Sequence, residues 1–156
     1  MMRNLLAGVA GGAAGTTALN AVTYLDMAAR ARPASSTPED TVRTAQELTG
    51  TGLGATDDDA DNRRSALGAL LGIASGLATG AVYGLLRPHL NRVPIALLGV
   101  GAGLAANIGT TGPMAALGVT DPRTWPAESW ISDLIPHLAY GLATAVAFDA
   151  FHSQPR

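Results

Sequence analysis

Four long apolar segments alternate with shorter polar segments along the chain. Each apolar segment is close to the roughly 20 residues that an α-helix needs to cross the hydrocarbon core of a bilayer. No run alternates apolar and polar residues with the period of two that is typical of a strand. The pattern therefore predicts an all-α, polytopic membrane protein, an antiparallel four-transmembrane-helix bundle forming a single membrane domain over residues 1–156. The predicted spans cover residues 5–25, 65–86, 94–117 and 128–151.

The second apolar segment carries a glycine at every fourth position. Its central stretch reads GALLGIASGLATGAVYG and contains no charged residue. In a soluble helix each interior glycine costs about 0.8–1.0 kcal/mol relative to alanine. In a membrane, small residues let two helix backbones approach closely. We therefore expect a neighbouring helix to lie along the row formed by Gly68, Gly72, Gly76, Gly80 and Gly84.

Shorter rows of small residues occur in two other spans. They predict the same kind of close helix packing, within the chain and between copies of it. The first span has Gly8, Gly12, Thr16 and Asn20 four residues apart, and the third has Gly99, Gly103 and Asn107.

A signal peptide is the alternative interpretation of the first apolar segment, because Arg3 precedes a run of apolar and small residues. That run exceeds about 20 residues and lacks a convincing A-x-A cleavage site. We therefore expect residues 5–25 to be a membrane span.

Residues 26–63 form the one long polar segment. Within it, Thr37 has the place of a helix cap, with Pro38 at the first helical position and an acidic residue three positions after the cap. Gly50 is a typical helix stop. The sequence predicts a short amphipathic helix over about 38–49, lying on the membrane surface or against the bundle.

Four aspartates gather just before the second span, between Asp57 and Asp61. An EF-hand loop that starts at Asp57 needs glycine at its sixth position and glutamate at its twelfth. This chain has Asn62 and Gly68 there. Acidic residues also favour the N-terminus of a helix through its dipole. We expect them to begin the second span; weak binding of a divalent ion is the alternative.

Composition excludes several classes of function. Only 14% of residues are charged, against about 25% in an average soluble domain. The absence of cysteine excludes disulfides, thiol nucleophiles and cysteine-ligated metals. A net charge of -2 without a basic patch argues against a nucleic-acid partner. We expect no metal and no other cofactor.

The fourth span begins with a row of polar side chains. Asp133 and His137 are four residues apart and Tyr140 is three further on, so we expect the three to share one helix face. Ionisable residues within spans are functional by default, and such a row beside Pro136 could relay protons. In the structural alternative, Asp133 caps backbone amides or holds His137, since it lies only about one turn from Trp130.

Two further polar positions lie near mid-span. Asn20 and Asn107 either hydrogen-bond to a neighbouring helix, worth about 0.6 kcal/mol on average, or line a polar pathway. Residues 110–113 interrupt the third span, so we expect a kink or a short unwound stretch there. Trp125 and Trp130 suit the aromatic belt at a membrane interface.

No catalytic motif is present: the sequence has no nucleophile elbow, P-loop, dinucleotide fingerprint or HExxH. We expect that the protein is not an enzyme. The leading hypothesis is a scaffold or accessory subunit in the lipid bilayer, assembled with copies of itself or in a larger membrane complex. The alternative is a small proton or solute channel or transporter that uses Asn107, Pro113, Asp133 and His137.

Three stretches of the chain resemble the YagU-type family of small bacterial inner-membrane proteins. They are RPASSTPED at 32–40, TGPMAALGVTDP at 111–122 and SDLIPHLAYG at 132–141. The neighbourhoods of Pro113 and His137 carry most of the likeness. The resemblance implies an integral protein of the inner membrane with a link to acid tolerance, and it implies no catalytic residues.

The orientation of the chain follows from its shortest link. Residues 87–93 join the second and third spans, lie on the side of both termini and carry Arg87 and Arg92. The other side holds more arginines in total, but the positive-inside rule applies best to short loops. We therefore expect cytoplasmic termini in the bacterial plasma (inner) membrane.

Overall fold

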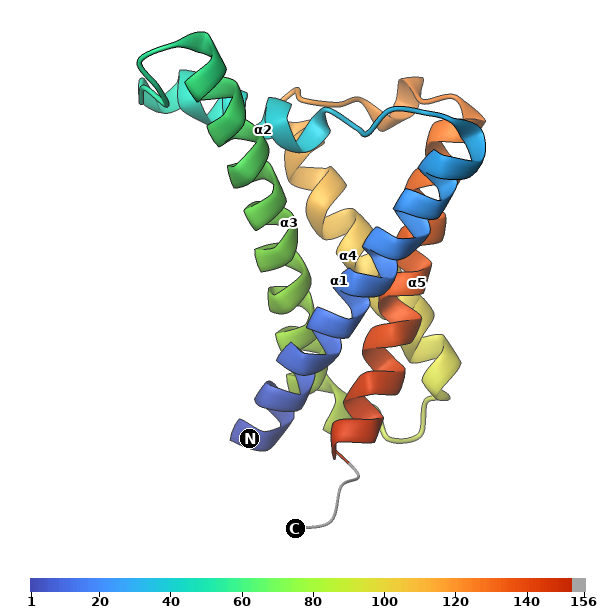
Figure 1. Cartoon of the computed structure of the whole chain (residues 1–156). Coiled ribbons are helices and arrows are strands. Elements are labelled where there is room, and N and C mark those ends of the chain that lie inside the picture. Colours follow the sequence, from blue (N-terminus) through green and yellow to red (C-terminus); the bar gives the residue numbers. More distant parts are fainter. Residues whose placement is uncertain (153–156) are drawn as a thin grey trace.

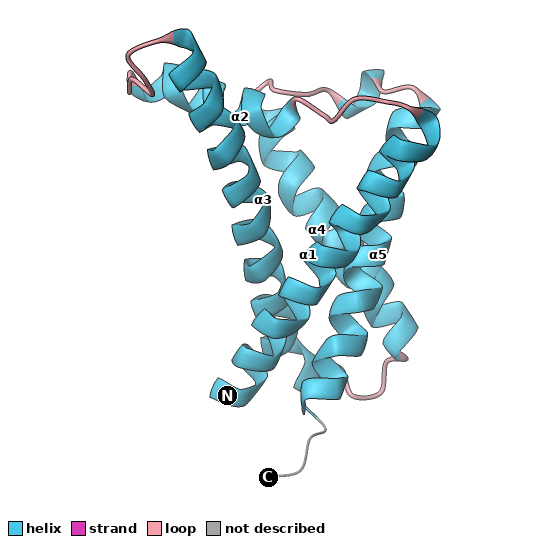
Figure 2. Ribbon diagram, in the orientation of Figure 1, coloured by secondary structure: helices cyan, strands magenta, loops and turns pink. Residues whose placement is uncertain are grey.

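The protein is all-helical in the computed structural model, which describes residues 1–152. No strand occurs within that range, and the helices are joined by short loops (Figures 1 and 2). The elements are α1 (Met2–Arg30), α2 (Thr37–Thr49), α3 (Asp57–Leu86), η1 (Arg87–Leu90), α4 (Ile95–Ala116), η2 (Pro122–Thr124) and α5 (Ala127–His152).

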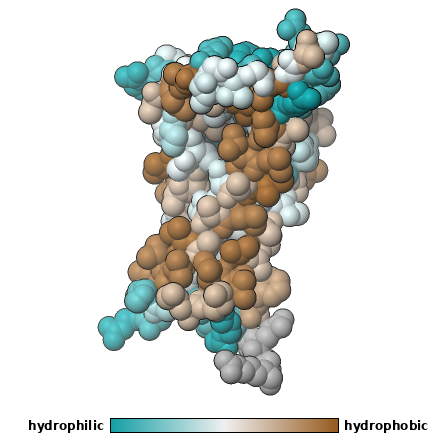
Figure 3. Space-filling model, turned by 90° about the vertical axis from the view of Figure 1, so that its left-hand side faces the viewer, coloured by the Kyte–Doolittle hydropathy of each residue, from teal (hydrophilic) through white to brown (hydrophobic). Residues whose placement is uncertain are grey.

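Four of these helices are long and apolar enough to cross a membrane, namely α1, α3, α4 and α5. Apolar side chains cover much of the flank of the molecule, and hydrophilic ones gather at its two ends (Figure 3). This distribution is typical of a protein surrounded by lipid. The predicted all-α class with four candidate spans is confirmed.

Helix α1 is central to the bundle. It packs against α3 on one side and α5 on the other, while α4 packs mainly on α5. Figure 1 shows α1 and α3 crossing close to the end of the molecule that holds the N-terminus and η1. From this crossing the two helices diverge towards the end that holds α2.

The crossing of α1 and α3 is a contact between backbones. A Cβ atom added at Gly80 would lie 2.5 Å from Gly12 Cα and 2.5 Å from the carbonyl oxygen of Gly8. One added at Gly12 would lie 2.6 Å from the carbonyl oxygen of Gly76. No side chain fits at these positions, because real Cβ contacts are longer than 3 Å. Glycine on both helices is therefore what allows this approach.

The other two main interfaces, α1 with α5 and α4 with α5, also bring backbones together at glycines. Gly11 and Gly15 of α1 meet the backbone of α5 at Thr144 and Tyr140. On α4, Gly99 and Gly103 meet α5 at Leu142 and His137, and both also lie against Gly141. The core between these helices includes Tyr140, Thr144, Ala145 and Phe148, each at most 1% exposed.

The expectation for Gly72 is wrong within this chain. A Cβ added there would meet nothing within 4 Å. Gly68, one turn earlier, lies against Pro38 of α2 and not against a membrane-spanning helix. The reason is the divergence of α1 from α3, which limits their contact to the part of the glycine row that begins at Gly76.

Helix α2 is the short helix predicted in the polar segment. It ends at Gly50, whose φ of 65° is the left-handed conformation of a helix stop. It lies against α3, where the Arg64 guanidinium donates hydrogen bonds to Gln46 at 3.0 and 3.1 Å. The N-cap position precedes the predicted one: the helix includes Thr37, and Ser36 occupies the cap position without a side-chain hydrogen bond to the helix backbone.

A kink or a short unwound stretch was expected at residues 110–113. The unwound stretch is absent, because α4 continues through Pro113 to Ala116 as one helix. Proline removes the hydrogen bond to the carbonyl four residues before it, and membrane-spanning helices tolerate that loss. The four residues of 110–113 therefore stay helical despite the proline.

The aspartates before the second span also take their expected place, since Asp57, Asp58 and Asp59 form the first turn of α3.

We predict that Gly80→Ala destabilises the bundle by about 1–3 kcal/mol, because the added methyl group forces α1 and α3 apart. Gly72→Ala on the same helix is the matched control. It meets open space within one chain, so in the monomeric protein it should be neutral or stabilising by up to about 1 kcal/mol, from helix propensity alone. Thermal unfolding of the monomer in detergent measures both changes. Equal effects of the two substitutions would contradict the interface described here.

Candidate functional site

Helices α4 and α5 bring three of the predicted polar residues together. Asn107, only 6% exposed, donates a hydrogen bond from Nδ2 to Oδ2 of Asp133. His137 lies one turn along α5, with its Nδ1 atom 3.5 Å from Oδ1 of Asp133 and 3.4 Å from Nδ2 of Asn107. The side chains of His137 and Asp133 are 14% and 26% exposed. The cluster is thus mostly, but not fully, enclosed.

The hydrogen bonds of the cluster favour one form of the His137 ring. Nδ1 lies 2.7 Å from the backbone carbonyl oxygen of Asp133 and donates to it. An Nδ1 that carries a proton leaves Nε2 as the acceptor in the neutral imidazole. Nε2 is therefore the free acceptor of the ring, while Nδ1 anchors the ring to α5.

Tyr140 does not belong to this cluster, contrary to the shared face expected for Asp133, His137 and Tyr140. Its hydroxyl donates a hydrogen bond to the carbonyl oxygen of Gly76 on α3, at 2.6 Å. Its ring passes Gly15 of α1, where an added Cβ would lie 2.8 Å from the ring. Tyr140 therefore ties α3 to α5 across α1 and has a structural role in place of a relay.

Asn20 is also separate from the cluster. It lies on an exposed part of α1, and its side chain makes no hydrogen bond within residues 1–152. The structure thus places neither Asn20 nor Tyr140 in line with Asn107 and His137. Pro113 is on α4, six residues beyond Asn107 towards the loop, and it is exposed. The polar residues that do meet are confined to one level of the bundle.

The two tryptophans lie at the start of α5, Trp125 in the preceding loop and Trp130 in the first turn. Their rings meet edge to face with centroids 5.2 Å apart. Trp125 donates a hydrogen bond from Nε1 to Thr120 at 2.8 Å, and Trp130 is 38% exposed. Both positions are at an end of the apolar flank, where an interfacial anchor belongs.

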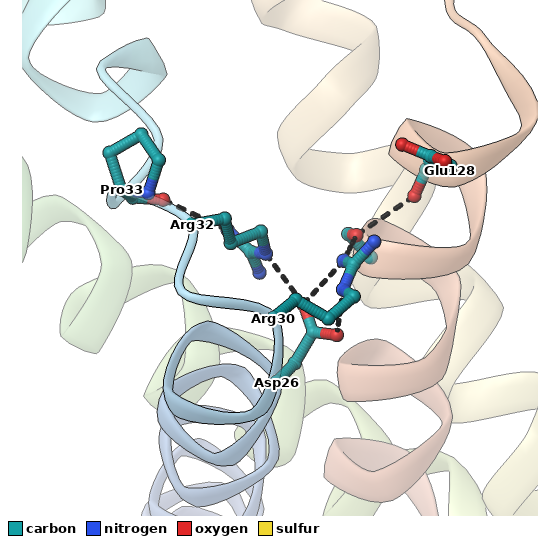
Figure 4. Close-up of polar contacts among 6 residues, drawn as sticks. Asp26, Arg30, Arg32, Pro33 and Glu128 are labelled. Atoms are coloured by element: carbon teal, nitrogen blue, oxygen red, sulfur yellow. Dashed lines mark hydrogen bonds and ion pairs between the residues drawn. The ribbon is translucent and has the colours of Figure 1, made fainter.

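A second polar group lies at the same end, around Asp26 (Figure 4). Arg30 and Arg32 both donate hydrogen bonds to its carboxylate, the shortest at 2.6 Å. These bonds, that of Arg30 first, lower the pKa of Asp26 from 3.8 to about 2. Arg30 also donates to Ser132 of α5. The group therefore joins the end of α1 to the start of α5, and Asp26 stays ionised at neutral pH.

Sequence reasoning missed two features of these sites. Gly141 of α5 was not expected to pack, yet it lies against Gly99 and Gly103. Its signal was available, because Ala145 follows it at the four-residue spacing of small residues in helix interfaces. The bond from Arg30 to Ser132 joins residues 102 positions apart and had no local signal. Within residues 1–152, no group of three His, Asp or Glu side chains is placed to hold a metal ion.

Comparison with known proteins adds no further identification. No protein-family model, curated protein or solved structure matches the chain. The likeness to YagU-type proteins therefore stays a prediction, and function has to be argued from the arrangement of residues.

Proposed function

We propose that the chain is a non-enzymatic scaffold or accessory subunit of a bacterial inner membrane, which assembles with its own copies or with partner helices. The observation that carries this proposal is a set of glycines in the spans that face away from the bundle. A Cβ added at any of them would meet nothing within 4 Å. They are Gly72 on α3 and Gly101, Gly109 and Gly112 on α4.

The three outward glycines of α4 share one side of the helix. From Gly101, eight residues lead to Gly109 and eleven to Gly112, which places them within about 80° around the axis. An exposed leucine needs no explanation in lipid, since lipid tails are equally apolar. A glycine inside a helix lowers the stability of that helix. Close packing of another backbone on the glycine compensates for this loss. The inward glycines of this chain are all used in that way.

Cysteine cross-linking in the membrane tests this proposal, since the chain has no cysteine of its own. We predict that Gly101→Cys and Gly72→Cys form cross-links to a second copy or to a partner protein. Val146→Cys on α5 is the control, because Val146 is 61% exposed and has no outward glycine beside it. Cross-linking that is as frequent from position 146 as from position 101 would argue against a specific interface.

The second candidate function is the conduction of protons or small solutes, with a link to acid tolerance. The Asn107–Asp133–His137 cluster favours it, because histidine and carboxylate side chains within spans are the groups that proton relays use. A conduit also needs polar groups along the rest of the span. The two residues expected to supply them, Asn20 and Tyr140, lie elsewhere. We therefore rank this function second.

Proton flux into vesicles after an acid jump separates the two functions. The scaffold proposal predicts the same flux with the reconstituted protein as with protein-free vesicles. If wild type conducts, and Asp133→Asn combined with His137→Ala abolishes the flux, the conduit replaces the scaffold as the leading function. His89→Ala is the control, since His89 is an exposed histidine in the link before α4.

A further inference from the structure

The side of α1 that faces away from the bundle carries a row of residues with the spacing of paired helices. The inward side holds the glycines between Gly8 and Gly15 that meet α3 and α5. The outward row advances by alternating steps of four and three residues, which is the spacing of the seam in left-handed helix pairs. Helix geometry places the whole row within about 80° around the axis. The row consists of Leu6, Ala10, Ala13, Thr17, Asn20 and Tyr24.

This row is an open surface of the chain. All of its members are exposed except Ala10, which is half-buried. Figure 1 shows α1 across the front of the bundle, with α4 behind it. The row is therefore separate from the outward glycines of α3 and α4.

Asn20 is the member of the row that lipid cannot satisfy. Its amide is exposed and makes no hydrogen bond within residues 1–152. Thr17, one turn earlier, differs, because its hydroxyl donates to the carbonyl oxygen of Ala13 in the same helix at 3.0 Å. Six residues, or about 9 Å, separate Asn20 from Asp26 at the polar end of the bundle. An asparagine side chain is too short to cover that distance, and lipid tails offer no donor or acceptor.

The chemistry of the amide favours a second copy of the chain as its partner. An asparagine side chain holds both an acceptor oxygen and a donor NH₂ group. Two copies related by a two-fold axis place a residue near that axis against itself, so each Asn20 could donate to the other and accept from it. Copies with the same orientation also hold Asn20 at the same depth in the membrane. No charged residue lies between Arg3 and Asp26 to oppose such a pairing.

The shape of the face also suits a helix. Ala10, Ala13 and Thr17 are small, and small residues let two helices approach closely. Towards the N-terminus, an apolar groove of about 390 Å³ is lined by Leu6 and Ala10 of α1 and by Phe151 of α5, among others. A side chain of a second copy can enter this groove. A single asparagine in such a seam also fixes the register of the paired helices.

We propose that two copies of the chain pair in parallel through the outward face of α1, with Asn20 beside the two-fold axis. Each Asn20 amide donates a hydrogen bond to the amide oxygen of the other copy. This pairing rests on the assembly proposed above as the function, and it names the partner and the face. Helix α1 then packs by its backbone inside the chain and by its side chains between copies.

Energy transfer between copies labelled with donor and acceptor dyes tests the pairing, in vesicles over a series of protein-to-lipid ratios. The wild type should dimerise. Asn20→Leu should raise the dissociation constant about tenfold, because it removes the hydrogen bonds between the copies. Asn20→Gln keeps an amide and should dimerise nearly as well as wild type. Both variants should fold normally, since Asn20 makes no hydrogen bond within residues 1–152.

Thr17→Val is the matched control, because Thr17 lies on the same face and its hydroxyl is already bonded within α1. It should leave dimerisation unchanged. Equal losses in Thr17→Val and Asn20→Leu would overturn the amide pairing, and so would unchanged dimerisation in Asn20→Leu.

Oxidation of Ala13→Cys identifies the partner, since the chain has no other cysteine. A disulfide-linked dimer of the chain with itself is expected, because a two-fold axis brings equal positions together. Cross-linking to a different protein in place of a second copy would overturn the choice of partner.

Failure of this pairing is distinguishable from failure of the proposed function. If Gly72→Cys and Gly101→Cys cross-link while Asn20→Leu dimerises like wild type, the α1 face is wrong and assembly stands. If the wild type stays monomeric at every ratio and no position cross-links, both proposals are wrong.

Discussion

The close contact between the backbones of α1 and α3 is the constraint on which the rest of this structure depends. Gly8 and Gly12 on one helix and Gly76, Gly80 and Gly84 on the other leave no room for a single methyl group between them. Without a hydrophobic drive between helices in lipid, dispersion and close packing must supply the association energy. Removing side chains from both partners is the most direct way to bring many backbone atoms into contact.

That contact also decides what the other helices can do. Because α1 lies so close to α3, the Tyr140 hydroxyl of α5 can reach past Gly15 to the carbonyl oxygen of Gly76 and tie three helices together. The same crossing makes α3 diverge from α1 towards α2, which leaves Gly72 bare. It also gathers the ends of α1, α3 and α5, where Tyr83 and His152 pack on the Phe148 ring and Arg3 contacts His152. Packing and assembly surface thus share one geometric cause.

Much of the fold follows from the sequence, because length and hydropathy suffice to locate four spans and glycine spacing identifies the packing faces. The spacing of glycines does not tell which helix packs on a given helix face, however. Gly72 and Gly76 belong to one row, yet the first is bare and the second meets α1. Glycine has no side chain whose chemistry could tell the two environments apart. The crossing point of α1 and α3 decides between them, and it depends on contacts between distant parts of the chain.

Prediction from the sequence is limited in the same way for the polar residues. Asn107, Asp133 and His137 were expected to form a polar region, and they do meet. Tyr140 was expected beside them. Three residues on a helix leave a rotation of about 60° from the starting direction, and Gly15 offers the ring a path to α3. The contacts of Tyr83 and His152 with Phe148 had no signal in the sequence, because nothing local relates the ends of α3 and α5.

Solid-state NMR of the protein in lipid, with ¹³C only at the glycine Cα atoms, measures the central contact most directly. We predict cross-peaks between glycines of different helices, for the pairs Gly8–Gly84, Gly12–Gly80 and Gly103–Gly141, and none from Gly72 to α1. A helical, folded protein in which the first two cross-peaks are missing would contradict it, since α1 and α3 would then not touch through their backbones.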